Sequence, residues 1–253
     1  MVTFLRSSIG KKLIMSLSGL FLLLFMAVHL VLNLAAMVSP ALYRQACEFM
    51  DTNILVKCMV PVLALGFIVH IIFSIWVEFK NWTGRPADSR YAVPCQSKAS
   101  SWASKNMFVL GVVVVLFLVL HFLNFWAHMQ LQSFLGKEGS DPYGLLVSTF
   151  QNPIYTILYI VWFIALYFHM SHGFWSAFQT IGLNNSNWIP RLQVIAKIYA
   201  AVVVLGFILV AVRFAVLPSA ENTPALEDAA AVEVVEEDGA TLEVEVEAVE
   251  AAQ

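Results

Sequence analysis

Five long apolar stretches constrain the fold of this chain more than any other feature. Each is long enough to cross a hydrocarbon core of roughly 30 Å, for which a helix needs about 20 residues. The composition agrees, because 60% of the 253 residues are hydrophobic and 12% are charged, unlike soluble domains. We therefore expect an all-α membrane protein with five transmembrane helices. The five stretches are residues 13–37, 54–77, 107–129, 154–181 and 192–216.

The distribution of lysine and arginine predicts how the chain is oriented in the membrane. With the N-terminus in the cytoplasm, ten of these residues fall on the inner side and four on the outer side, as the positive-inside rule requires. This predicts a multi-pass protein of the bacterial cytoplasmic (inner) membrane, with its C-terminus outside. The segment 79–106 is then the main inner connection, and we expect it to be ordered at the membrane interface.

Residues 218–253 differ in character from the rest of the chain. They hold 11 of the 17 acidic residues and no lysine or arginine. Such a segment has too little apolar surface to fold, so we expect a disordered acidic C-terminal tail. The sequence thus predicts two parts, a membrane domain over 1–217 and the tail. The membrane domain alone has 14 basic and 6 acidic residues, a net charge of about +8.

Four of the six histidines lie inside four different apolar stretches: His29, His70, His121 and His169. An ionisable ring in lipid costs several kcal/mol unless it faces the interior of a helix bundle and finds a partner. With a rise of 1.5 Å per residue, His29 and His121 lie roughly 25 Å from the inner ends of their helices, and the other two roughly 12 to 17 Å. In an up-down-up-down bundle, the first and third helices share one diagonal and the second and fourth the other. Each pair can therefore meet across the bundle axis, at levels roughly 10 Å apart.

Paired neutral imidazoles in a bundle core suit the two axial positions of a haem iron. The two levels therefore predict two b-type haems held by the first four helices. The three cysteines lack the spacing of covalent haem attachment. The alternative is that the rings only bind neighbouring helices or line a proton path, as in a haem-free proton-coupled transporter.

Three glycines near these histidines are further candidates for the haem site: Gly19, Gly111 and Gly173. The first two precede His29 and His121 by ten residues each, and the third follows His169 by four. A missing side chain would let a flat macrocycle approach the helix backbone, although small residues also serve ordinary packing between membrane helices.

The other two histidines have weaker claims to a ligand role. His172 competes with His169 for nearly the same helix face, and we prefer His169 because its depth matches that of His70 more closely. His128 lies near the outer interface, where we expect a polar end residue or, alternatively, a contact to a quinone.

The chain resembles the dihaem cytochrome b subunits of succinate dehydrogenases and fumarate reductases. The resemblance is carried by residues 16–29 (SLSGLFLLLFMAVH), His70, His121 and the sequence His169-Met-Ser-His-Gly173. The resemblance covers about residues 5 to 217 and leaves the tail out. It implies that His70 and His169 bind the inner haem, and that His29 and His121 bind the outer one.

The resemblance also implies partners for the chain. Members anchor a flavoprotein subunit and an iron–sulfur subunit on the cytoplasmic side, and they exchange electrons with a quinone, usually menaquinone. The chain would be the non-catalytic electron-transfer subunit of an oxidoreductase complex in a respiratory chain, without dicarboxylate chemistry of its own. The basic residues Arg85, Arg90 and Lys98 fit a docking surface, and the positive-inside rule predicts the same charges.

In this family the quinone site typically lies near the outer haem, which makes Glu48, Asp51 and His128 the candidates here. Glu48 and Asp51 fit solvated loop charges equally well. The rival functions are a cytochrome b subunit of a hydrogenase or formate dehydrogenase, the transporter named above, and a purely structural membrane anchor.

Overall fold

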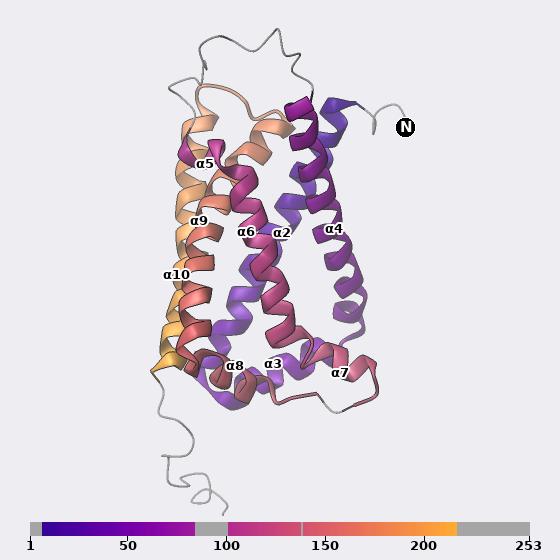
Figure 1. The fold of residues 1–253 in the computed structure, drawn as a ribbon, viewed down its shortest axis with the longest axis vertical. Helices are drawn as coiled ribbons and strands as arrows, with labels where there is room; N and C mark the ends of the chain where they lie inside the picture. Colours follow the sequence, from indigo (N-terminus) through magenta and orange to yellow (C-terminus); the bar gives the residue numbers. More distant parts are fainter. Residues whose placement is uncertain (1–6, 84–100, 138, 217–253) are drawn as a thin grey trace, which may run out of the picture. The chain divides into compact units, whose positions relative to one another are not determined.

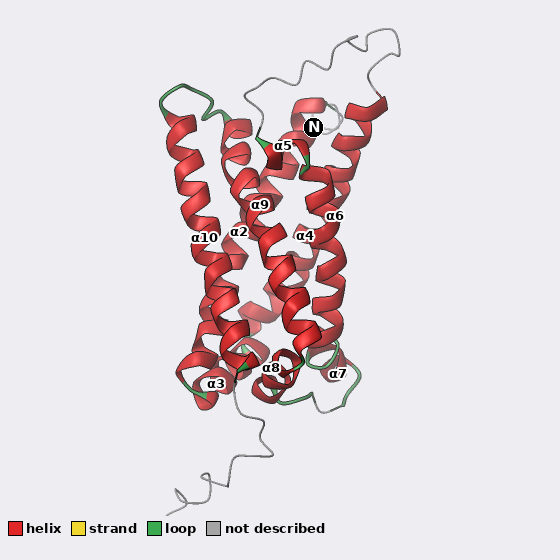
Figure 2. Ribbon diagram, turned by 60° about the vertical axis from the view of Figure 1, so that its left-hand side comes forward, coloured by secondary structure: helices red, strands yellow, loops and turns green. Residues whose placement is uncertain are grey.

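The structure is a computed structural model that describes residues 7–83, 101–137 and 139–216, and within these ranges the regular secondary structure is helical (Figure 1, Figure 2). Five of its helices are long and apolar enough to cross a membrane. The expected all-α class and the five membrane helices are therefore confirmed. These helices are α2 (Ser8–Val38), α4 (Ile54–Thr83), α6 (Met107–His121) with the π-helical turn η2 (Phe122–Trp126), α9 (Pro153–Ile181) and α10 (Trp188–Ala215).

Helix α9 shows how short sequence signals fix the ends of these helices. Asn152 caps its N-terminus, because its Oδ1 accepts a hydrogen bond from the backbone N–H of Ile154 at 3.0 Å. Pro153 occupies the first helical turn, where its missing N–H costs nothing. The helix ends at Gly182, whose φ of 118° is left-handed. The N–H groups of Gly182 and Leu183 donate to carbonyls of the last turn at 3.2 and 3.0 Å.

Short helices lie at both ends of the long ones. One end, called the α3 end below, carries α3 (Pro40–Thr52), α7 (Gln130–Phe134) and α8 (Pro142–Gln151), and the opposite α5 end carries α5 (Trp102–Lys105) (Figure 1). The third apolar stretch was expected to continue to residue 129, but its helical part ends at Trp126. Both α3 and α8 begin with a capping residue and a proline, Ser39-Pro40 and Asp141-Pro142. A capping residue followed by proline is typical of the first residues of a helix, and these two short helices were not predicted from the sequence.

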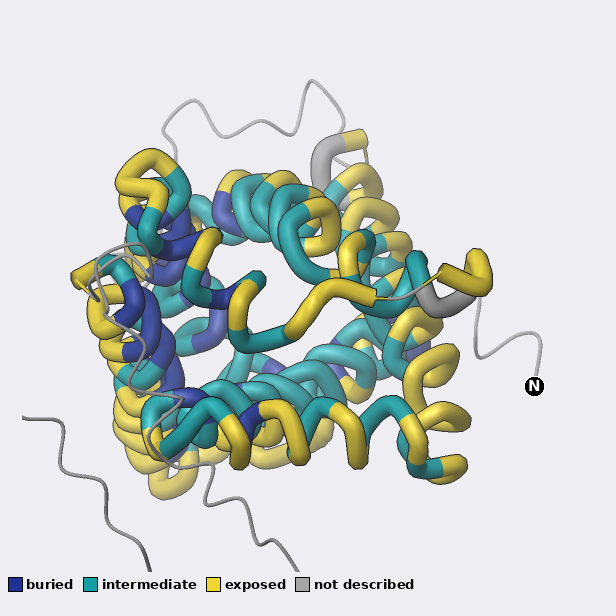
Figure 3. The backbone as a smooth tube through the Cα atoms, turned by 90° about the horizontal axis from the view of Figure 1, so that it is seen from below, coloured by how far each residue is buried: buried dark blue, intermediate teal, exposed yellow. Residues whose placement is uncertain are grey.

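The long helices alternate in direction (Figure 1). Helix α2 packs against α4 and α9, α6 packs against α9, and α10 covers α9 and α2. The contact between α4 and α6 is slight. The buried core lies on the side of α9 and α10, at the left of Figure 3, and it includes the fully buried Ala196, Ala200 and Ala211. Such small side chains let membrane helices approach closely.

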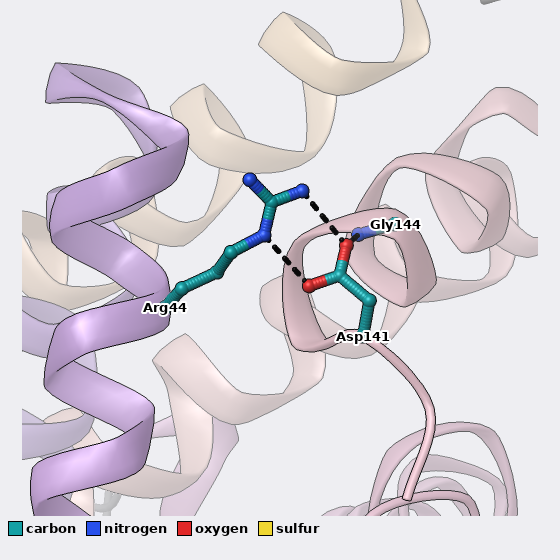
Figure 4. Close-up of polar contacts among 3 residues, drawn as sticks. All are labelled: Arg44, Asp141 and Gly144. Atoms are coloured by element: carbon teal, nitrogen blue, oxygen red, sulfur yellow. Dashed lines mark hydrogen bonds and ion pairs between the residues drawn. The ribbon is translucent and has the colours of Figure 1, made fainter. Parts of the chain in front are cut away.

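An ion pair ties α3 to the start of α8 at the α3 end (Figure 4). Arg44 donates from Nε to Asp141 Oδ1 at 2.8 Å and from Nη2 to Oδ2 at 3.0 Å. Asp141 Oδ2 also accepts from the backbone N–H of Gly144 at 2.8 Å and so caps α8. The hydrogen bond from Arg44 holds the pKa of Asp141 below its usual value.

Two expectations fall on residues outside the described ranges. The inner connection 79–106 is described only where α4 extends to Thr83 and from residue 101 onward. Arg85, Arg90 and Lys98 lie outside the described residues, as does the tail 218–253. The docking surface and the acidic tail therefore stay predictions.

Candidate functional site

A cavity of about 720 Å³ lies among the long helices. Its wall is formed mainly by apolar side chains of α2, α4, α6 and α9, and its size is typical of cofactor sites. The four histidines expected to bind haem all line it: His29, His70, His121 and His169. One ring comes from each of the four helices, so the cavity collects side chains that are far apart in the sequence.

The four rings lie in two pairs inside this cavity. The ring centres of His29 and His121 are 5.8 Å apart, and those of His70 and His169 are 6.3 Å apart. Two imidazoles that bind one metal from opposite sides, each at about 2 Å from nitrogen to metal, place their ring centres roughly 6 Å apart. Both separations therefore fit a metal ion between the rings. These are also the two pairs expected from the sequence.

The second ring nitrogen of His70 has a partner that fixes its tautomer. His70 Nδ1 lies 3.2 Å from the carbonyl oxygen of Met15, to which it can only donate. The proton is therefore on Nδ1, and Nε2 keeps the lone pair that a metal needs. Because Met15 lies early in α2, this contact also places the His70 pair toward the α5 end.

His29 has a polar neighbour on its own helix. The amide of Asn33 donates to the carbonyl oxygen of His29 at 2.8 Å, and its distance of 3.5 Å to His29 Nε2 is at the limit of a hydrogen bond. The shorter of the two contacts of the Asn33 amide is therefore the one to the backbone of its own helix.

Several buried polar atoms in the cavity wall find no hydrogen-bond partner within the described ranges. They are Nδ1 of His121, Nδ1 of His169, Nδ1 of His172 and Nε1 of Trp162. Buried polar atoms are almost always paired in folded proteins, and all four residues line the same cavity. This concentration of unpaired donors and acceptors favours a cavity that holds a ligand with polar groups.

Two of the candidate glycines lie against the rings of the His70 pair. A Cβ on Gly19 would be 3.1 Å from His70 Cε1, and a Cβ on Gly111 would be 3.7 Å from His169 Cε1. Each glycine thus faces a histidine of a neighbouring helix. Gly173 also lines the cavity, and a Cβ there would be 3.6 Å from the methyl group of Met107.

The structure separates His169 from His172. His169 lies opposite His70, whereas His172 lines the cavity one turn farther along α9 and contacts the ring of Trp175 edge-on at 5.0 Å. The preference for His169 as the partner of His70 agrees with this geometry. His172 is half-buried, and its Nδ1 is a buried atom without a hydrogen-bond partner among the described residues.

The three quinone candidates lie in different surroundings. Glu48 and His128 are exposed, and neither is part of the cavity wall. Asp51 accepts a hydrogen bond from Gln130 Nε2 at 3.2 Å, and Gln130 does line the cavity. Asp51 is therefore joined to the cavity through Gln130, a residue that sequence analysis did not single out.

Within the described parts of the chain, no group of three or more histidine, cysteine or carboxylate side chains is placed to bind a metal ion. The nitrogen donors come in twos instead. Pairs of imidazoles suit a metal whose four remaining positions are filled by a porphyrin, so the residues present fit a haem better than a metal ion held by protein alone.

Comparisons with known proteins give one informative relative. No family model and no solved structure matches the chain. Over 173 residues, which are 67% of this chain and 76% of the relative, it is 24% identical to the succinate dehydrogenase cytochrome b558 subunit of Bacillus subtilis (strain 168). The resemblance expected from the histidine motifs is thus confirmed as a distant similarity to a cytochrome b subunit of succinate dehydrogenase.

Proposed function

We propose that this chain is the membrane cytochrome b subunit of a complex of the succinate dehydrogenase and fumarate reductase type. It carries electrons between an iron–sulfur subunit and a membrane quinone, of the menaquinone type, through two b haems, each held by two histidines. The observation that carries the proposal is the pairing of histidine rings at 5.8 and 6.3 Å inside one cavity. The similarity to a cytochrome b558 subunit supports the same function.

The chain's own residues would hold and orient the two cofactors. His29 and His121 would bind one haem, and His70 and His169 would bind the other. The first four long helices would thus form a haem-binding bundle. When bound, haem would supply one-electron chemistry, which no side chain of these four helices can perform by itself. The hydrogen bond to Met15 orients the ring of His70 and raises the basicity of its Nε2.

The two ends of the bundle would then serve different partners. With the α5 end in the cytoplasm, the flavoprotein and iron–sulfur subunits would dock there, nearer to the His70 pair. The quinone would react at the α3 end, nearer to the His29 pair. Gln130 would donate to a quinone carbonyl, and Asp51 would position its amide.

A haem assay on the purified complex tests this function. We expect two b-type haems per chain by pyridine haemochrome, together with a flavin-bearing and an iron–sulfur subunit. His29→Ala should remove one haem, whereas His128→Ala should keep both, because His128 is exposed and lies off the cavity wall. A complex without haem would refute the proposal in favour of a transporter or structural anchor. Hydrogenase or formate dehydrogenase subunits in the complex would identify a different oxidoreductase.

A further inference from the structure

Lys11 is a buried cation near the start of α2. It is 5% exposed, whereas the next residue, Lys12, is exposed. A lysine near the end of a membrane helix usually extends its ammonium group into water, and Lys11 leaves too little of its surface uncovered for that. Lysine is almost never buried to this degree unless it is paired. Lys11 therefore calls for a negative charge inside the protein.

The described residues do not supply this negative charge. Nζ of Lys11 lies 4.0 Å from the centre of the Trp76 ring, and an aromatic face attracts a cation without neutralising it. The first turn of α2 holds no acidic residue, and the positive end of the helix dipole disfavours a cation there. Among the described residues Lys11 forms no ion pair, not even with Glu78, the acidic residue of the cavity wall. Lys11 is thus a buried cation that an anionic ligand would balance.

Lys11 lies at the rim of the cavity, at its α5 end. Helix α2 begins at that end (Figure 1). Met15, one turn beyond Lys11, lines the cavity, and its carbonyl oxygen is 3.2 Å from His70 Nδ1. On α4, Trp76 follows His70 by six residues. At a rise of 1.5 Å per residue, these two offsets place Lys11 roughly 6 to 9 Å from the level of His70, toward the α5 end. Its ammonium group is therefore close to any ligand of His70 that extends in this direction.

The α5 rim of the cavity is polar, whereas the wall between the two histidine pairs is not. Ser74 and Glu78 line the rim from α4, and Ser176 lines it from α9. Between Gly111 and His121, by contrast, α6 contributes apolar side chains alone to the wall. Burying a charged group without partners is costly, so the charged part of a ligand is more stable at the rim than between the pairs.

We propose that Lys11 binds a propionate carboxylate of the haem held by His70 and His169. The inference rests on the proposed function, because it takes haem as the ligand of this pair. A b-type haem carries two propionate groups at one edge of the macrocycle, and both are ionised at neutral pH. At the α5 rim this edge meets the Lys11 ammonium group, which the Trp76 ring holds in place. Lys11 is then a positioning residue, because it fixes which edge of the macrocycle points to the α5 end.

Resonance Raman spectra and redox titrations of the intact complex test this contact. The propionate bending bands of haem respond to ion pairs and hydrogen bonds of the carboxylates. We expect Lys11→Gln to shift these bands and to favour the ferric form of one haem, because an unbalanced carboxylate stabilises the more positive iron. The redox equilibrium should move at least several-fold, where tenfold equals a fall of about 59 mV in midpoint potential for one electron. Lys12→Gln is the matched control and should resemble the wild type, since Lys12 is exposed.

Further variants separate an ion pair with haem from the other roles that Lys11 could have. Lys11→Arg keeps the charge, so it should hold the potential near the wild-type value while shifting the propionate bands. If Lys11→Gln loses haem, the bands of Lys11→Arg decide the question in the same way. Unchanged bands would overturn the inference and leave the ammonium group to a lipid phosphate. Loss of the Lys11→Gln effect in a Glu78→Gln background would overturn it in favour of Glu78 as the counter-ion. A wild-type complex without haem would instead refute the proposed function, so the two failures are distinguishable.

Discussion

Gly19→Ala should disturb the His70 haem site, whereas Gly111→Ala should not. The new Cβ at position 19 would lie 3.1 Å from His70 Cε1 and 3.4 Å from its Nδ1. The first distance is tighter than normal carbon contacts, so the ring must move by a few tenths of an ångström. At position 111 the corresponding distance to His169 is 3.7 Å, an ordinary van der Waals contact. The two substitutions are otherwise alike, since both add one methyl group to a membrane helix.

The expected magnitudes follow from the contacts of His70. Its hydrogen bond to Met15 is 3.2 Å long, and a shift of the ring would bring it to the limit of about 3.5 Å. Losing such a bond in a membrane protein costs roughly 0.6 kcal/mol, which the helix preference of Ala over Gly, roughly 0.5–1 kcal/mol, offsets. The folded state should thus be about as stable as before. Affinity for the metal should fall roughly 10- to 100-fold, as when a ligand histidine loses its orienting partner.

Redox titration and haem content of the purified complex measure this effect. We expect the Gly19→Ala protein to unfold at the wild-type temperature but to show a shifted midpoint potential or partial loss of one haem. Gly111→Ala should match the wild type in both measurements. Equal behaviour of the two variants would refute the reasoning, because it would mean that the 3.1 Å contact does not set the position of the His70 ring.

Three further predictions concern other residues. His169→Ala should lose one of two b-haem signals in the reduced optical spectrum, whereas His172→Ala should keep both; the opposite pattern would reverse the assignment. Arg44→Ala should lower stability by roughly 0.2–1 kcal/mol, because its ion pair with Asp141 is exposed to solvent. The pKa of Asp141 is lowered in the folded state. The stability contributed by the ion pair is therefore present above about pH 4 and is lost as the pH falls through the lowered pKa. The difference in unfolding temperature between wild type and Arg44→Ala should accordingly be largest at neutral pH and shrink in acid. Gly182→Ala should cost roughly 1–2 kcal/mol, since it forces a side chain into a left-handed conformation, and an unchanged unfolding temperature would contradict this.

The long helices could be predicted because the length and hydropathy of a stretch decide whether it spans a membrane. Pairing of the histidines followed from the alternating direction of consecutive helices and from the depth of each ring. The helical part of the third stretch ends earlier than expected because η2 follows His121 directly and gives way to a turn after Trp126. Hydropathy does not register such a change of backbone geometry.

To predict which residues the glycines contact, one needs the rotation of each helix about its own axis as well as the depth of each residue in the membrane. Ten residues correspond to about 1000° at 3.6 residues per turn, which leaves Gly19 roughly 80° away from the face of His29. The same angle separates Gly111 from His121, so both glycines turn toward a neighbouring helix. Gln130 could not be found from sequence, because its place in the cavity wall depends on how α7 folds back.

The one-sided attachment of α4 bears on how the empty and filled forms of the protein differ. Helix α4 packs chiefly against α2, and its contact with α6 is slight. A cofactor gripped between His70 and His169 would bridge α4 and α9 across the interior. The cofactor would therefore restrict the movement of α4, which the polypeptide alone holds mainly through its contact with α2.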